Sequence, residues 1–238
     1  MINPPVNALT WTLGSVAVYV FAYKSWRTYK ATKNPLAQIY ALMSAGLATA
    51  FFFFGVPALL TDNTDILRFT YLLADITVQI TLQLEIWLLW FLGLRNKIRL
   101  RTLIIMTSMF SIVLLLTEAT TSKARISDSP HLVVYSDIPS VLIMKSIIYV
   151  GIAIPLGYFF LRQVPKQTTP QAKARLLLSA LTFITLSLAA TSNNIFDNGS
   201  DTLQSTLILA GLFTVLLIVS LLPNRKAGPS ANRPTISR

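Results

Sequence analysis

Long apolar stretches separated by short polar segments dominate the chain. Most of them approach the roughly 20 residues that cross a hydrocarbon core about 30 Å thick as a helix. The fourth and sixth runs are shorter, but both end at charged or polar residues and contain no charge. The pattern predicts an all-α polytopic integral membrane protein, a bundle of seven transmembrane helices within residues 1–222. The seven runs cover Ala8–Trp26, Leu36–Leu60, Phe69–Gly93, Thr102–Thr117, Pro139–Leu161, Leu176–Ser192 and Leu203–Leu222.

The charges between these runs alternate in sign along the chain. The segments after the first, third, fifth and seventh runs hold sixteen basic residues and no acidic residue. The other segments hold three basic residues and seven acidic ones, with Glu118 and Asp137 among the acids. Because short cytoplasmic loops retain Lys and Arg, we expect an outer amino terminus and a cytoplasmic carboxyl terminus. The sixteen residues are Lys24, Arg27, Lys30, Lys33, Arg95, Lys97, Arg99, Arg101, Arg162, Lys166, Lys173, Arg175, Arg225, Lys226, Arg233 and Arg238.

Composition excludes several functional classes. Of the 238 residues, 53% are hydrophobic and 12% are charged, which is about half the charged share of an ordinary soluble domain. The chain has no cysteine and one histidine, His131. Disulfides, thiol nucleophiles and paired-histidine metal or haem sites are therefore excluded. We expect a protein of the cell membrane that is not an enzyme and binds no metal or cofactor.

The net charge of +11 indicates anionic lipid head groups as partners. A nucleic-acid-binding protein would gather its basic residues on one face with aromatic residues nearby, whereas here they form four clusters separated by predicted spans. Tryptophans near span ends agree with this interpretation, because Trp and Tyr favour the membrane interface. We expect Trp11, Trp26, Trp87 and Trp90 to act as interfacial anchors.

The connections are short except for Glu118–Ile138 on the predicted outer face. Within it, His131–Tyr135 is expected to form a short strand or to lie along the membrane surface. A long outer loop serves as a binding loop or as a tether, and both remain open. Asn198-Gly-Ser formally matches a glycosylation sequon. Residues 223–238 are basic and rich in Pro, Gly, Ser and Asn, which predicts a disordered cytoplasmic tail too short to be an output domain.

Three ionisable residues interrupt the apolar runs: Asp75 and Glu85 in the third, and Lys145 in the fifth. Asp75 and Lys145 lie at matching depths, so we expect them to form an ion pair inside the bundle. Gln79 and Gln83 follow Asp75 at i+4 steps and extend a polar stripe. This group is interpreted either as a ligand pocket or as a structural clamp between helices. The candidate lining residues are Asp75, Gln79, Lys145, Tyr149, Asn193, Asn194 and Gln204.

The layout resembles the amino-terminal seven-helix sensor region of bacterial membrane histidine kinases. The resemblance rests on the basic segment Lys24–Lys33, the entry Arg68–Asp75 into the third run, and the longer outer segment after the fourth run. It implies sensing of a ligand or of the membrane state with cytoplasmic output. The kinase portion has no counterpart in this sequence, so the signal would pass to a separate cytoplasmic partner.

These observations lead to three functional hypotheses. The first is a seven-transmembrane receptor or sensor module. The second is a small-solute or ion transporter that uses the polar site between the third and fifth runs. The third is a structural subunit of a membrane complex, bound to the other subunits.

Overall fold

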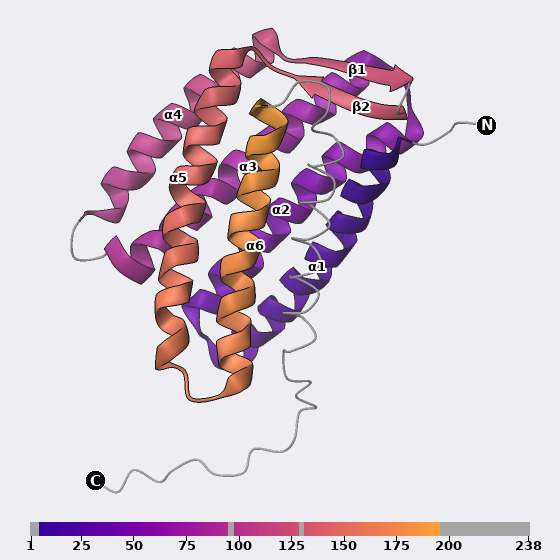
Figure 1. The fold of residues 1–238 in the computed structure, drawn as a ribbon. Helices are drawn as coiled ribbons and strands as arrows, with labels where there is room; N and C mark the ends of the chain where they lie inside the picture. The colour runs from indigo at the N-terminus through magenta and orange to yellow at the C-terminus, as the bar shows by residue number, and fades with distance from the viewer. Residues whose placement is uncertain (1–4, 95–97, 129–130, 196–238) are drawn as a thin grey trace, which may run out of the picture.

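The computed structural model describes residues 5–94, 98–128 and 131–195, and this part of the chain forms six long helices and one β-hairpin (Figure 1). Five helical segments are long and apolar enough to cross a membrane: Val6–Thr32, Pro35–Leu60, Thr64–Leu94, Leu100–Thr121 and Pro139–Lys166. The chain is therefore a helical, multi-pass membrane protein. The predicted seventh run, Leu203–Leu222, lies outside the described residues.

The elements follow one another along the bundle with short connections. Helix α3 continues into a π-helical turn, Trp90–Leu94, and α5 into a short 3-10 turn, Val164–Lys166. The elements are α1 (Val6–Thr32), α2 (Pro35–Leu60), α3 (Thr64–Leu89), α4 (Leu100–Thr121), β1 (Lys123–Asp128), β2 (His131–Ser136), α5 (Pro139–Gln163) and α6 (Pro170–Ile195).

Capping signals set several helix boundaries. The side chain of Asn34 accepts a hydrogen bond from the Leu36 amide at the start of α2, and Asn63 caps α3 in the same way. Helix α1 ends at Lys33, which adopts the left-handed conformation. The helices extend beyond the predicted apolar runs. Most importantly, α4 reaches Thr121 rather than ending at Thr117, so the prediction that Glu118 belongs to a loop is wrong.

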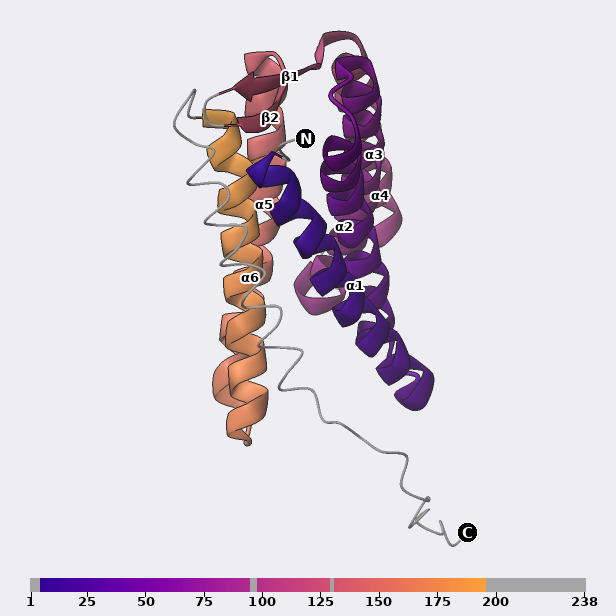
Figure 2. The same cartoon turned by 90° about the vertical axis from the view of Figure 1, so that its right-hand side faces the viewer.

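Neighbouring helices pack along the bundle in sequence order. Figures 1 and 2 show α5 and α6 side by side, and α1, α2 and α3 likewise pack in succession. Gly55 permits the close approach of α1 and α2, since a Cβ there would lie 2.7 Å from the Thr12 amide nitrogen. A buried apolar cluster joins α2, α3, α5 and α6. Its fully buried members include Ile39, Leu88, Leu156 and Ala180.

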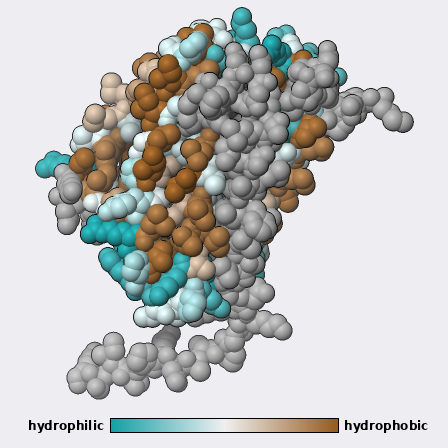
Figure 3. All heavy atoms as spheres, in the orientation of Figure 1, coloured by the Kyte–Doolittle hydropathy of each residue, from teal (hydrophilic) through white to brown (hydrophobic). Residues whose placement is uncertain are grey.

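The surface carries an apolar band between two polar ends, as Figure 3 shows for one face. We call these the hairpin end, which holds β1 and β2, and the basic end, which holds the α1–α2, α3–α4 and α5–α6 connections. Trp11 is an exception to the predicted interfacial anchors: it is 7% exposed and packs against Phe54 and Tyr135. Its role is internal packing. The basic residues described at the basic end are Lys24, Arg27, Lys30, Lys33, Arg99, Arg101, Arg162, Lys166, Lys173 and Arg175.

Strands β1 and β2 form an antiparallel hairpin in which Lys123 pairs with Ser136 and Asp128 pairs with His131. The strand predicted at His131–Tyr135 is confirmed. The hairpin is fastened to the start of α1 by Asn7. The Asn7 side chain donates to the Val133 carbonyl at 2.7 Å and accepts from the Val133 amide at 3.2 Å. This pair of bonds satisfies a backbone position of the edge strand, as a neighbouring strand would.

Candidate functional site

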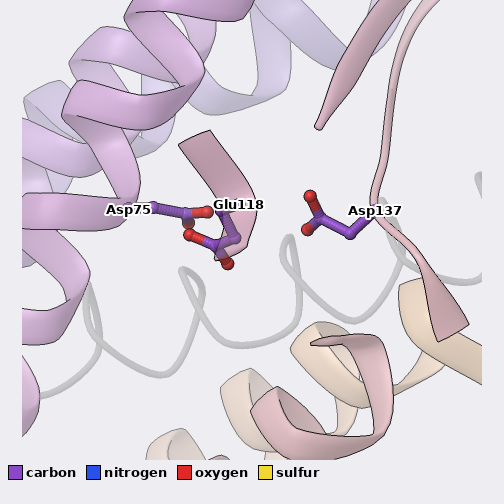
Figure 4. A group of neighbouring side chains, drawn as sticks. All are labelled: Asp75, Glu118 and Asp137. Carbon is purple, nitrogen blue, oxygen red and sulfur yellow. The ribbon is translucent and has the colours of Figure 1, made fainter. Parts of the chain in front are cut away.

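A buried group of charged and phenolic side chains lies at the hairpin end of the bundle. We call it the Lys145 cluster and define it by Tyr71, Asp75, Glu118, Asp137 and Lys145. Figure 4 shows its three acids, which approach one another from α3, α4 and the segment between β2 and α5. Asp75 is 3% exposed, Lys145 5% and Glu118 0%. The cluster therefore ties three helices to the β-hairpin within the interior.

The ammonium of Lys145 occupies the centre of the cluster. Its Nζ donates to Asp75 Oδ2 at 2.8 Å, to Asp137 Oδ2 at 2.8 Å and to the Tyr71 hydroxyl at 2.9 Å. The Tyr71 hydroxyl in turn donates to Asp137 Oδ2 at 2.6 Å. An ammonium has three N–H groups, so these contacts use all of them. The ion pair predicted between Asp75 and Lys145 is confirmed.

Glu118 is the least satisfied member of the cluster. It forms an ion pair with Lys145, but both of its carboxyl oxygens are buried without a hydrogen-bond partner in the described part of the chain. Asp137 Oδ1 is likewise buried without a hydrogen-bond partner among the described residues. Buried polar atoms are nearly always hydrogen-bonded, so Glu118 Oε2 and Asp137 Oδ1, which contact neither Lys145 nor another donor, are the exceptions in the cluster.

Helical spacing explains how the cluster is assembled. Tyr71 and Asp75 are four residues apart and share one face of α3. Glu118 continues the buried face of α4 that begins with Ser111 and Leu114. Arg68, one turn before the α3 pair, donates to the Ala119 carbonyl at 2.7 Å and thereby joins α3 to the end of α4.

The hairpin covers the cluster through an aromatic contact. The Tyr135 ring on β2 stacks on the Tyr71 ring, with centroids 4.7 Å apart and planes inclined by 15°. Phe54 of α2 packs against both rings. Burial raises the pKa of the Tyr135 phenol, because the phenolate would lose its hydration. Tyr135 therefore remains a neutral aromatic cover over the buried charges.

The polar stripe on α3 continues toward the basic end but faces α4. Ser111 donates to Gln79 Oε1 at 2.7 Å, and Thr107 donates to Gln83 Oε1 at 2.7 Å. The predicted stripe is thus present. Gln79, however, is engaged with α4 and does not contact the Lys145 ammonium.

The remaining candidate residues lie elsewhere. Tyr149 packs against the apolar cluster between α3 and α5. Asn193 and Asn194 belong to α6, and their side chains are not among those described. Gln204 lies outside the described residues. Glu85 is half-buried on α3 and makes no ion pair within the described part of the chain.

Sequence reasoning missed Tyr71, Glu118 and Asp137. Glu118 directly follows the fourth apolar run and Asp137 shortly precedes the fifth, so the pattern places both acids in the segment between these runs. The helical spacing of Ser111, Leu114 and Glu118 was the available signal for Glu118. Asp137 offers no comparable pattern, because its contact depends on where the hairpin returns the chain.

The acids could in principle enclose a cation, because their closest oxygens all lie within 4.8 Å of one another. Lys145 Nζ already contacts a carboxylate oxygen of each acid. The position that a metal ion would take is therefore filled by a cation that belongs to the protein. The arrangement can hold charges, protons and helix positions.

No protein-family model, curated protein or solved structure matches the chain.

Proposed function

We propose that the chain is a membrane receptor or sensor module that relays events at its hairpin end to a separate partner at its basic end. The observation that carries this proposal is the junction between the hairpin and the Lys145 cluster. Asp137 directly follows β2 and binds Lys145, while Tyr135 of β2 stacks on Tyr71. A displacement of the hairpin would thus alter contacts that hold α3, α4 and α5 together.

The proposed orientation places the hairpin end outside and the basic end in the cytoplasm, with a seventh span at residues 203–222. The distribution of charge supports it, because the basic connections gather at one end of the described bundle. An outer amino terminus and a cytoplasmic tail follow from this orientation. The resemblance to kinase-linked sensor regions supports a relay to another protein.

The Lys145 cluster suits such a relay because its members belong to different elements. A small ligand or a change in the surrounding lipid that moved Asp137 would withdraw one of the three hydrogen-bond partners of the ammonium. Buried ionic groups do not tolerate a lost partner, so the remaining partners would have to rearrange. The helices that carry them would then shift toward the basic end.

Spin labels can test this coupling, since the chain contains no cysteine that would interfere. Thr102→Cys at the start of α4 and Thr168→Cys between α5 and α6 place two exposed labels at the basic end. We expect Asn7→Ala, which releases the hairpin from α1, to change the distance distribution between them. The control Asn63→Ala removes an asparagine at the same end that contacts α3 alone. Unchanged distances in the Asn7 variant would contradict the sensor proposal.

A proton or cation carrier is the second candidate. It is favoured by the ionisable side chains of Asp75, Glu85, Glu118 and Lys145 within the spanning helices, because such residues commonly mark ion pathways. Vesicles that contain the purified protein and an internal pH dye can test it. Flux above that of protein-free vesicles, lost in Lys145→Met, would support a carrier, and flux equal to that of empty vesicles would exclude proton transport.

A further inference from the structure

The charges of the Lys145 cluster do not balance if all of its acids are ionised. One ammonium faces three carboxyl groups, which would leave a net charge of 1 − 3 = −2 in the interior. A buried carboxylate that lacks a full set of partners takes up a proton instead of remaining charged. At least one acid of the cluster is therefore expected to hold a proton.

The approach of Glu118 to Asp75 identifies where that proton lies. An oxygen of each of the three acids lies within 4.8 Å of the others, and Figure 4 shows the carboxyl groups of Glu118 and Asp75 next to each other. Two carboxylates contain acceptors only, so a hydrogen bond between them requires a proton on one. Glu118 Oε2 is buried without a hydrogen-bond partner in the described residues, so it is an oxygen that could carry such a proton.

Helix ends decide which acid carries the proton. Glu118 lies in the last turn of α4, where the partial negative charge of the helix end opposes a carboxylate. Asp137 lies two residues before α5, where the opposite end of a helix favours a carboxylate. Asp137 also accepts hydrogen bonds from Tyr71 and Lys145. Of the two acids, Glu118 is therefore the better place for the proton.

We propose that Asp75 and Glu118 form a proton-binding site in which one proton resides on Glu118 and is donated to Asp75 at neutral pH. A metal ion is the competing ligand, but the Lys145 ammonium already contacts all three acids. A proton needs no space beyond the gap between the two carboxyl groups. The site goes beyond the proposed sensor function, because it is present whether or not the hairpin relays a signal.

The groups around the proton come from every element that meets there. Tyr71 belongs to α3, Asp137 to the segment after β2, and Lys145 and Tyr149 to α5. Arg68 binds the Ala119 carbonyl, next to Glu118. Lys145 is the only cation in contact with the acids among the residues that the structure describes. Loss of the proton would leave Asp75 and Glu118 repelling each other across the α3–α4 contact.

Isotope labelling can read the proton directly, because Glu85 and Glu118 are the only glutamates of the chain. We would label glutamate with carboxyl ¹³C and record infrared spectra of the full chain in phosphatidylcholine vesicles, in H₂O and D₂O at neutral pH. Glu85→Gln lies outside the cluster and leaves Glu118 as the single labelled group. We expect its carbonyl band at the position of a protonated acid, with a shift in D₂O.

Asp75→Asn provides the second measurement, since it replaces the acceptor of the proposed hydrogen bond. The Glu118 band should move in this variant and remain unchanged in Thr107→Val, which removes a polar contact with Gln83 between the same two helices outside the cluster. A carboxylate band from Glu118 at neutral pH would overturn the proposal. Binding of Mn²⁺ that moves the Glu118 band in the Glu85→Gln protein, whose cluster is intact, would overturn it in favour of a metal site. The protonation state of Glu118 and the effect of Mn²⁺ are both measured with the cluster intact, so neither test depends on whether the Asp75 variant folds.

Discussion

Lys145 is kept charged in the interior by partners that belong to other parts of the chain. Its three N–H groups meet Asp75, Asp137 and Tyr71, so solvent is not needed to satisfy them. A buried ionic cluster adds little to the free energy of unfolding compared with well-packed apolar side chains. Removal of one member is nevertheless costly, because the desolvation of the remaining charged groups is no longer compensated. The cluster therefore specifies how the helices meet more than it adds net stability.

Lys145→Met should destabilise the fold by about 3–5 kcal/mol, because the acids would lose their shared cation. Unfolding by denaturant in mild detergent micelles would measure the change in free energy. Addition of Asp75→Asn should restore only part of the loss, since Asp137 would still lack its ammonium partner. Lys123→Met on the exposed face of β1 is the matched control and should stay within about 0.5 kcal/mol. Equal stability of the Lys145 and Lys123 variants would show that the cluster is not a unit.

Single residues were predictable where a charge interrupted an apolar run. Asp75 and Lys145 stood out for that reason, and their pairing followed from their depths. Glu118 and Asp137 lay among polar neighbours, where acids are ordinary. Their burial depends on Lys145, which is 27 residues from Glu118 in sequence and reaches it only through the fold (145 − 118 = 27). No local pattern records such a contact.

At the scale of elements, α1 and α2 approach each other closely at Gly55. A Cβ on Gly55 would lie 2.7 Å from the Thr12 amide nitrogen and 2.8 Å from the Ala8 carbonyl oxygen. Both atoms belong to the backbone and cannot rotate away. The contact therefore requires a residue without a side chain on α2.

Gly55→Ala should force α1 and α2 apart and cost about 1–3 kcal/mol, as overpacking does. Thermal unfolding in detergent would detect the loss. Gly151→Ala makes the same chemical change on α5 at a position with nothing within 4 Å. That control should be neutral or stabilise by up to about 1 kcal/mol through its greater helix propensity. A Gly55 variant as stable as the Gly151 variant would rule out the close approach.

Asn7→Ala should loosen the hairpin, because Val133 would lose two hydrogen-bond partners in a buried setting. We expect about 1–3 kcal/mol of local destabilisation. Hydrogen exchange followed by mass spectrometry should show faster exchange in β1 and β2. Asn34→Ala, which removes the cap of α2 at the basic end, should leave hairpin exchange unchanged. Identical hairpin exchange in both variants would argue against the anchor.

The elements were predictable to the extent that their signals are local. Apolar runs identified the described helices, and a short strand at His131–Tyr135 was one of the two expected arrangements of that segment. Strand β1 and the anchor at Asn7 were missed, because both depend on pairing. Asn7 is separated from Val133 by 126 residues, and its role arises only once α1 and β2 meet.

On the scale of the whole molecule, basic residues gather at one end of the described bundle and the hairpin lies at the other. Charge distribution of this kind normally records how a chain is inserted, since Lys and Arg resist translocation. The six described helices alternate in direction (Figure 1), so each connection lies at one of these two ends. Reagents that cannot cross a membrane can therefore distinguish the ends.

Arg125→Cys on β1 should react with a membrane-impermeant maleimide in intact cells, because we place the hairpin outside. Thr168→Cys at the basic end should react only after the cells are opened. Both positions are exposed, so burial would not explain a difference between them. The cysteine-free chain serves as the background control. Labelling of Thr168→Cys in intact cells would reverse the proposed orientation.

The order in which the cluster residues are synthesised has a consequence for biogenesis. Asp75 and Glu118 emerge from the ribosome on α3 and α4 before Lys145 exists. An ionised side chain at the centre of a span costs about 2.5–3.5 kcal/mol to insert, and a proton on the acid removes much of that cost. The two acidic helices therefore reach the translocon without their cation. The cluster is complete only after α5, which carries Lys145, has been synthesised. A chain interrupted before α5 would therefore present two unpaired acids to membrane quality control.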